Sequence, residues 1–121
     1  MKRVLFLTNF ASPYRVHFFD ELGKYMDVTV LYSDRVEDMK HRNAAWFEEG
    51  DHGFHAVRLT PKFRVGRRYL CFDVLPWLKK KFDAIVVCGT TGEATTMTYK
   101  ERMRTIEFCV KYVDGRIPVI A

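Results

Sequence analysis

The chain lacks the sequence features that mark several large classes of protein. No apolar run approaches the roughly 18 residues of a membrane-spanning helix, and no signal-peptide cleavage pattern follows the first strand-like segment. The three cysteines, Cys71, Cys88 and Cys109, are odd in number and widely spaced, which argues against a disulfide framework and a paired-cysteine metal site. We therefore expect a cytoplasmic protein in which the cysteines are small core residues.

Signatures of cofactor and nucleophile chemistry are missing as well. The sequence contains no GxGxxG dinucleotide motif, no GxxxxGK[ST] phosphate loop, no HExxH zinc motif and no GxSxG nucleophile motif. No nucleic-acid-binding motif is present either. We therefore expect no cofactor, no metal and no nucleic-acid partner.

Positive charge is in modest excess, with 20 Lys and Arg against 15 Asp and Glu and a formal net charge of +5. Basic residues gather in two short segments: Lys62, Arg64, Arg67 and Arg68, then Lys79, Lys80 and Lys81. Such clusters are typical of a solvated surface. The alternative interpretation is a peripheral contact with an anionic membrane.

The hydrophobic pattern that remains indicates one α/β domain. A chain of 121 residues with 48% hydrophobic residues is long enough for one core. Short apolar segments typical of strands occupy residues 4–8, 28–32, 54–59, 84–87 and 117–121. They alternate with helical patterns that begin at Pro13, cover residues 69–81 and begin after Thr98, whereas residues 34–52 are ambiguous.

Local signals define the ends of these helices. Ser12 is a suitable N-cap and Pro13 a favoured first helical residue. Thr98 and Glu101 have the spacing of a capping box, and Gly115 stands where a helix ends. Pro76 predicts a kink or a new start within residues 69–81.

Right-handed crossovers between these strands predict a parallel five-stranded sheet of order 3-2-1-4-5. We therefore expect a Rossmann-like three-layer sandwich over residues 1–121, incomplete at its C-terminus. The last strand, residues 117–121, is apolar and would lie at a sheet edge. Such an edge favours self-association.

The end of the chain carries specific motifs. The string Cys88-Gly89-Thr90-Thr91-Gly92-Glu93-Ala94 and the later GRIPVIA resemble dihydrodipicolinate synthase and its pyruvate-dependent aldolase relatives, which are TIM barrels. The resemblance covers residues 83–121. It implies that Thr90 and Thr91 bind a substrate carboxylate, with Thr91 in a proton relay. The same chemistry needs a Schiff-base lysine, tyrosines and an arginine from later strands, so we expect both threonines to be vestigial here.

The front of the chain resembles a different family. The string KRVLFLTNFASPYRVHFFDELGKYMDVTVLY is similar to the opening of a family 4 glycosyltransferase, which has two Rossmann-like domains in the GT-B arrangement. That resemblance covers residues 1–89 and implies a glycan or lipid-linked acceptor. The implied acceptor-binding residues are Asn9, Ser12, Tyr14, Arg15 and His17. The simpler alternative is that they start a helix and face solvent.

The two resemblances meet within residues 83–89, which suggests a chimera or a fragment. Our leading hypothesis is the acceptor-side domain of a glycosyltransferase that is inactive alone, since the donor-binding domain is absent. One alternative is a fragment of dihydrodipicolinate synthase, a lyase of lysine biosynthesis. The other is a fold chimera without activity.

Overall fold

The computed structural model describes residues 1–8, 13–32, 52–59, 63–65, 68–70, 74–87 and 98–121. Its strands are β1 (Arg3–Thr8), β2 (Asp27–Tyr32), β3 (His55–Arg58), β4 (Phe63–Val65), β5 (Arg68–Leu70), β6 (Ala84–Val86) and β7 (Val119–Ile120). Its helices are α1 (Pro13–Leu22), α2 (Leu75–Leu78) and α3 (Tyr99–Val113). The ambiguous segment 34–52 lies almost wholly outside the described residues.

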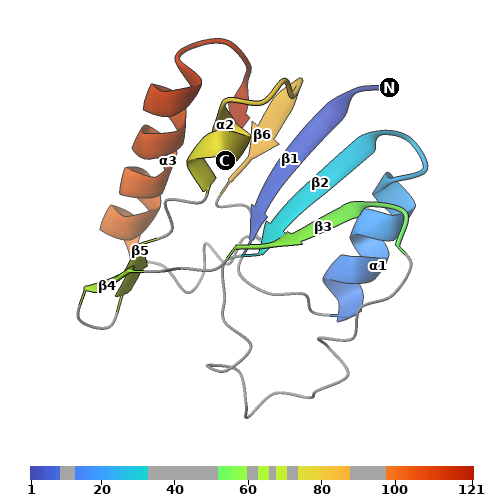
Figure 1. Ribbon diagram of the computed structural model, residues 1–121, viewed down its shortest axis with the longest axis horizontal. Coiled ribbons are helices and arrows are strands. Elements are labelled where there is room, and N and C mark those ends of the chain that lie inside the picture. The colour runs from blue at the N-terminus through green and yellow to red at the C-terminus, as the bar shows by residue number, and fades with distance from the viewer. Residues whose placement is uncertain (9–12, 33–51, 60–62, 66–67, 71–73, 88–97) are drawn as a thin grey trace.

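Five strands form one parallel sheet in the order β3-β2-β1-β6-β7. This order confirms the predicted 3-2-1-4-5 topology, because β6 and β7 are the fourth and fifth of the expected strands. Figure 1 shows the sheet with α1 on one side and the α2–α3 pair on the other. The three-layer α/β/α arrangement therefore also agrees with the sequence.

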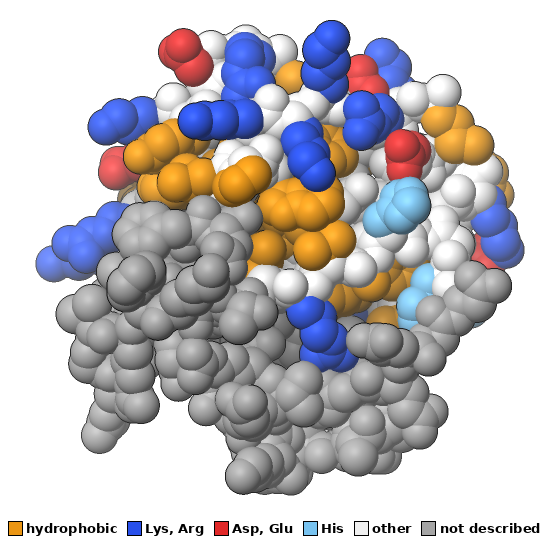
Figure 2. Space-filling model, viewed as in Figure 1, with side chains coloured by type: hydrophobic (Ala, Val, Ile, Leu, Met, Phe, Trp, Pro, Cys, Tyr) orange, Lys and Arg blue, Asp and Glu red, His pale blue; other side chains and the backbone are white. Residues whose placement is uncertain are grey.

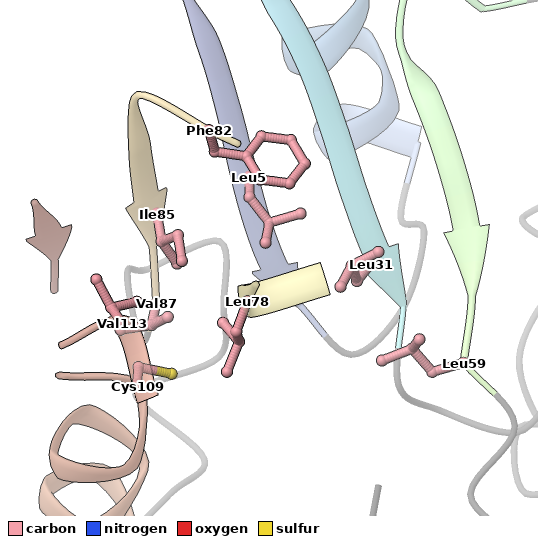
Figure 3. Close-up of a cluster of buried hydrophobic side chains, with 9 residues drawn as sticks. All are labelled: Leu5, Leu31, Leu59, Leu78, Phe82, Ile85, Val87, Cys109 and Val113. Atoms are coloured by element: carbon pink, nitrogen blue, oxygen red, sulfur yellow. The ribbon is translucent and has the colours of Figure 1, made fainter. Parts of the chain in front are cut away.

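Alternating side chains of the sheet build a core on each face. On the α1 face, Phe6, Val30 and Phe19 pack together and are at least nine-tenths buried. On the other face, Leu5 and Ile85 pack with Leu78 of α2, and each of these three is 0% exposed. Figure 3 shows this second cluster between the sheet and the helices. Both cores follow from the period of two along each strand.

Helix α3 has the ends that the sequence predicts. Thr98 Oγ1 accepts from the Glu101 backbone N–H at 3.2 Å, and the Glu101 carboxylate accepts from the Thr98 N–H at 2.9 Å. At the other end Asp114 and Gly115 have φ of 51° and 68°. On its buried face Cys109 and Val113 are each 1% exposed, whereas Val110 is 51% exposed. Cys109 is thus a core residue, and Cys71 and Cys88 lie outside the described residues.

The predicted helix over residues 69–81 is wrong at residues 69–70 and confirmed at Leu75–Leu78, where Pro76 marks the predicted new start. Arg68–Leu70 is strand β5, which pairs antiparallel with β4, and helix starts only at Leu75. Pro76 stands in the first turn of α2, the one place in a helix where a missing N–H costs little. The β4–β5 pair was not expected, although Phe63-Arg64-Val65 alternates and two residues separate the strands, as in a tight hairpin.

Helix α1 meets the segment before β3 at unusually short range. The Gly53 backbone N–H donates to Asp20 Oδ1 at 2.8 Å, and His52 Nδ1 lies 3.4 Å from Asp20 Oδ2. A Cβ added to Gly23 would lie 2.1 Å from the Gly53 carbonyl oxygen. This approach requires glycine at position 23 and fixes where β3 begins.

Strand β1 pairs with β2 from the front of the chain and with β6 from its later part. Its register places Val4 opposite both Val28 and Ala84. At the start of the strand, Arg3 N–H donates to Asp83 Oδ2 at 2.7 Å, and Asp83 N–H donates to the Arg3 carbonyl at 2.7 Å. We call these contacts and the β1–β6 ladder the β1–β6 joint.

Candidate functional site

The sequence-predicted residues after β1 divide into three groups. Asn9 and Ser12 lie outside the described residues. Tyr14 and His17 are exposed on α1, Tyr14 by 65%, so both can face a ligand or solvent. Arg15 is only 3% exposed, which rules out the alternative that it is a solvated side chain.

Arg15 is held at the carboxyl end of β1. Its Nη1 donates to Thr8 Oγ1 at 3.3 Å, and its Nε donates to the Tyr14 hydroxyl at 3.0 Å. The guanidinium carbon also lies 5.5 Å from the centre of the Tyr14 ring. Helix α1 thus places a positive charge at this edge of the sheet.

Tyr32, at the end of β2, was missed by sequence reasoning. It is 3% exposed and lies opposite Thr8 of β1 and Arg58 of β3. Within the described part of the chain its hydroxyl has no hydrogen-bond partner. The only sequence signal was a polar atom at the carboxyl end of a predicted strand, where open α/β sheets bind ligands.

Burial raises the pKa of Tyr32 to about 12, although the charges of Arg58 and Arg15 oppose the rise. The unfolded phenol titrates near 10.0, so between these values the unfolded chain loses a proton that the folded chain keeps. The contribution to stability is complete below pH 10 and is lost towards pH 12, an effect of about 3 kcal/mol. We expect Tyr32→Phe to remove this part of the alkaline loss, measured by urea unfolding at pH 9 to 12.

Tyr25→Phe is the matched control, because Tyr25 is 76% exposed. Its alkaline unfolding curve should follow that of the native protein. Equal pH dependence of the native protein and Tyr32→Phe would contradict the raised pKa.

The second predicted site follows β6. Thr90 and Thr91 lie outside the described residues, but the strand before them and the helix after them are both placed. The segment therefore leaves the carboxyl end of β6, at the same edge of the sheet as Thr8 and Tyr32. At the start of α3 the capping box already uses the Thr98 and Glu101 N–H groups, and Glu101 adds a negative charge. The box therefore leaves fewer N–H groups at this helix start for an anion.

Basic residues around α2 are exposed. Lys79 and Lys81 face solvent, and Lys80 lies with its Nζ 3.6 Å from the centre of the Trp77 ring. Figure 2, viewed as in Figure 1, shows Lys and Arg side chains spread over the upper part of the molecule, where the N-terminus and α2 lie. Of the first basic cluster, Lys62 and Arg67 lie outside the described residues, while Arg64 and Arg68 belong to β4 and β5.

In the described ranges, residues 1–8, 13–32, 52–59, 63–65, 68–70, 74–87 and 98–121, neither a membrane-spanning helix nor a metal-binding group of side chains is found. No helix there is long and apolar enough to cross a membrane. In the same ranges, no three His, Cys, Asp or Glu side chains gather in a way that would hold a metal ion.

Comparison with known proteins identifies relatives of the end of the chain. Residues 74–121 match the Dihydrodipicolinate synthetase family. The 4-hydroxy-tetrahydrodipicolinate synthase 1 of Clostridium acetobutylicum is 59% identical over 49 residues, and the synthase of Clostridium tetani is 56% identical over 50 residues. The synthase of Thermoanaerobacter sp. is 54% identical over 50 residues. Each alignment covers 40% of this chain and 17% of the relative. No solved structure matched the chain.

The prediction of a glycosyltransferase acceptor domain is contradicted by these matches. Its physical basis was weak, because an apolar strand, a Ser-Pro helix start and a second strand occur in many parallel sheets. The match begins at Val74, ahead of the predicted boundary at Asp83. The chain spans about a sixth of the length of these relatives, and its residues 74–121 are similar to the Dihydrodipicolinate synthetase family.

Proposed function

We propose that residues 74–121 supply the carboxylate-binding loop of a pyruvate-dependent lyase of the dihydrodipicolinate synthase type. One observation carries the proposal: the family match includes the whole string Gly89-Thr90-Thr91-Gly92-Glu93 together with the strands on either side. The substrate class is a short 2-oxo acid. The relatives are longer proteins, because the alignments cover only 17% of each relative's length. The complete lyase activity is therefore proposed for a longer protein.

The residue types of this loop suit the binding of a carboxylate. Gly89 and Gly92 have no side chain to block the approach of an anion to backbone N–H groups, and the Thr90 and Thr91 hydroxyls can donate to a carboxylate. The α3 capping box already uses the Thr98 and Glu101 N–H groups, which favours the threonine hydroxyls as donors. In this proposal Thr91 also carries the proton relay.

The test is a titration of the 121-residue protein with pyruvate, followed by amide NMR. We expect saturable shifts at Thr98 and Tyr99, which flank the loop, with a dissociation constant near ~1 mM, as suits a few hydrogen bonds. Thr91→Val should weaken binding several-fold, because it removes one donor at nearly constant volume. Thr105→Val is the matched control, since the Thr105 hydroxyl already donates to the Glu101 carbonyl at 2.9 Å, one turn into α3.

We expect no condensation of pyruvate with aspartate semialdehyde by this chain alone. The Schiff-base lysine, the tyrosines and the arginine of the family come from strands beyond the aligned part. Borohydride reduction in the presence of pyruvate should leave every lysine unmodified in mass spectra. A trapped lysine adduct would show that the chain holds its own Schiff-base lysine, and absence of pyruvate shifts would overturn the loop's proposed role.

A further inference from the structure

Three neighbouring strands end in polar residues on one face of the sheet. Thr8 lies opposite Tyr32, and Tyr32 lies opposite Arg58. Residues opposite one another in parallel strands project to the same face. That face is the one covered by α1, because Tyr32 packs in the same cluster as Phe19. Together with Arg15 of α1, we call Thr8, Tyr32 and Arg58 the edge cluster.

The four residues of the edge cluster include two guanidinium groups, those of Arg15 and Arg58. Arg15 is almost fully buried, and its bond to Thr8 fixes the guanidinium beside the end of β1. Arg58 adds a second, exposed guanidinium two strands away. The first turn of α1 contains no acidic residue, and its N-terminus contributes further positive potential at this edge. Asp20 is the acidic group whose charge also acts on Tyr32.

The Tyr32 hydroxyl is the second, independent sign of a ligand. A buried hydroxyl with no partner among the described residues is costly, because folding takes it out of water without a replacement bond. It sits between the strands that carry Thr8 and Arg58. A phenol hydroxyl is protonated near neutral pH and is a donor there. Two cations and one unused donor together suit an oxygen anion.

We propose that the edge cluster binds a small oxyanion, the phosphate or carboxylate group of a small molecule, with Tyr32 donating the hydrogen bond and Arg15 and Arg58 supplying charge. The site belongs to residues 8–58. It is therefore separate from the family match over residues 74–121 and independent of the proposed pyruvate loop.

The experiment titrates the whole chain with inorganic phosphate and, in a second arm, with acetate, at ionic strength held constant with chloride. Amide NMR should show saturable shifts at Thr8, Arg15 and Tyr32. Tyr32→Phe keeps the buried ring and should weaken binding about tenfold, the loss of one charge-assisted hydrogen bond. Arg58→Gln should weaken it about threefold, as suits an exposed charge. Arg104→Gln, an exposed arginine on α3, is the control and should change nothing.

The two arms identify the source of the anion: phosphate binding alone indicates a phosphoryl group, and acetate binding alone a carboxylate. Binding of neither, or equal affinity in Tyr32→Phe and the native protein, would overturn the site. An equal loss in Arg58→Gln and Arg104→Gln would show general attraction to a basic protein and would also overturn it. Thr91→Val should leave phosphate binding unchanged, so failure of the pyruvate loop and failure of this site are separable.

Discussion

Gly23→Ala is expected to destabilise the protein by about 3 kcal/mol, at the upper end of overpacking costs. The added Cβ would lie 2.1 Å from the Gly53 carbonyl oxygen and 2.9 Å from its carbonyl carbon. Both are backbone atoms, so relief requires α1 to move away from the start of β3. That movement would also strain the bond from the Gly53 N–H to Asp20. Urea unfolding at neutral pH measures the loss.

Gly115→Ala is the matched control, because it makes the same change without a clash. Nothing lies within 4 Å of the Cβ added there, although φ of 68° imposes a cost of about 1 kcal/mol. The two variants thus separate steric contact from backbone strain. A Gly23→Ala protein as stable as Gly115→Ala would contradict the short approach between α1 and Gly53.

Leu5→Ala is expected to cost about 3 to 4 kcal/mol, because it opens a cavity at the centre of the sheet. Leu5 is 0% exposed and pairs with both Thr29 of β2 and Ile85 of β6. The loss is a large share of a total stability of roughly 5 to 15 kcal/mol. Val110→Ala on the exposed side of α3 is the control and should change stability by less than about 0.5 kcal/mol.

Hydrogen exchange in Leu5→Ala adds a second readout. Because Leu5 contacts both halves of the sheet, protection should fall in β2 and in β6 together. Unchanged protection across residues 74–121 would instead show that this segment is a separate cooperative unit. It would also contradict a shared core.

The five strands of the sheet could be predicted because their signals are local, and right-handed crossovers then gave their order. Apolar runs identified five strands, and the capping residues Thr98 and Glu101 identified α3. The β4–β5 hairpin was not predicted, because Tyr69, Leu70 and Val74 have a spacing that also suits a helix. Only Pro76 distinguished a strand from a helix in this segment. A proline disfavours helix in the residue before it, and the prediction gave this effect too little weight.

The edge cluster was predictable only in part. Arg15 was singled out from its place after the first strand, but its burial depends on Thr8 and on the sheet behind it. Tyr32 and Arg58 are brought together by strand register, which no local pattern reveals. The assignment of the front of the chain to a glycosyltransferase failed for a related reason: a β-α-β pattern indicates a fold and not a reaction.

The β1–β6 joint also bears on how the chain folds. Arg3 bonds to Asp83, 80 positions along the chain, and pairs with Asp27, only 24 positions away. Closing the longer loop costs only about 1 kcal/mol more in chain entropy, because that cost grows with the logarithm of length. Pairings between distant segments nevertheless form slowly. We therefore expect the β1–β2–β3 half to assemble first and the docking of β6 onto the edge of β1 to limit the folding rate.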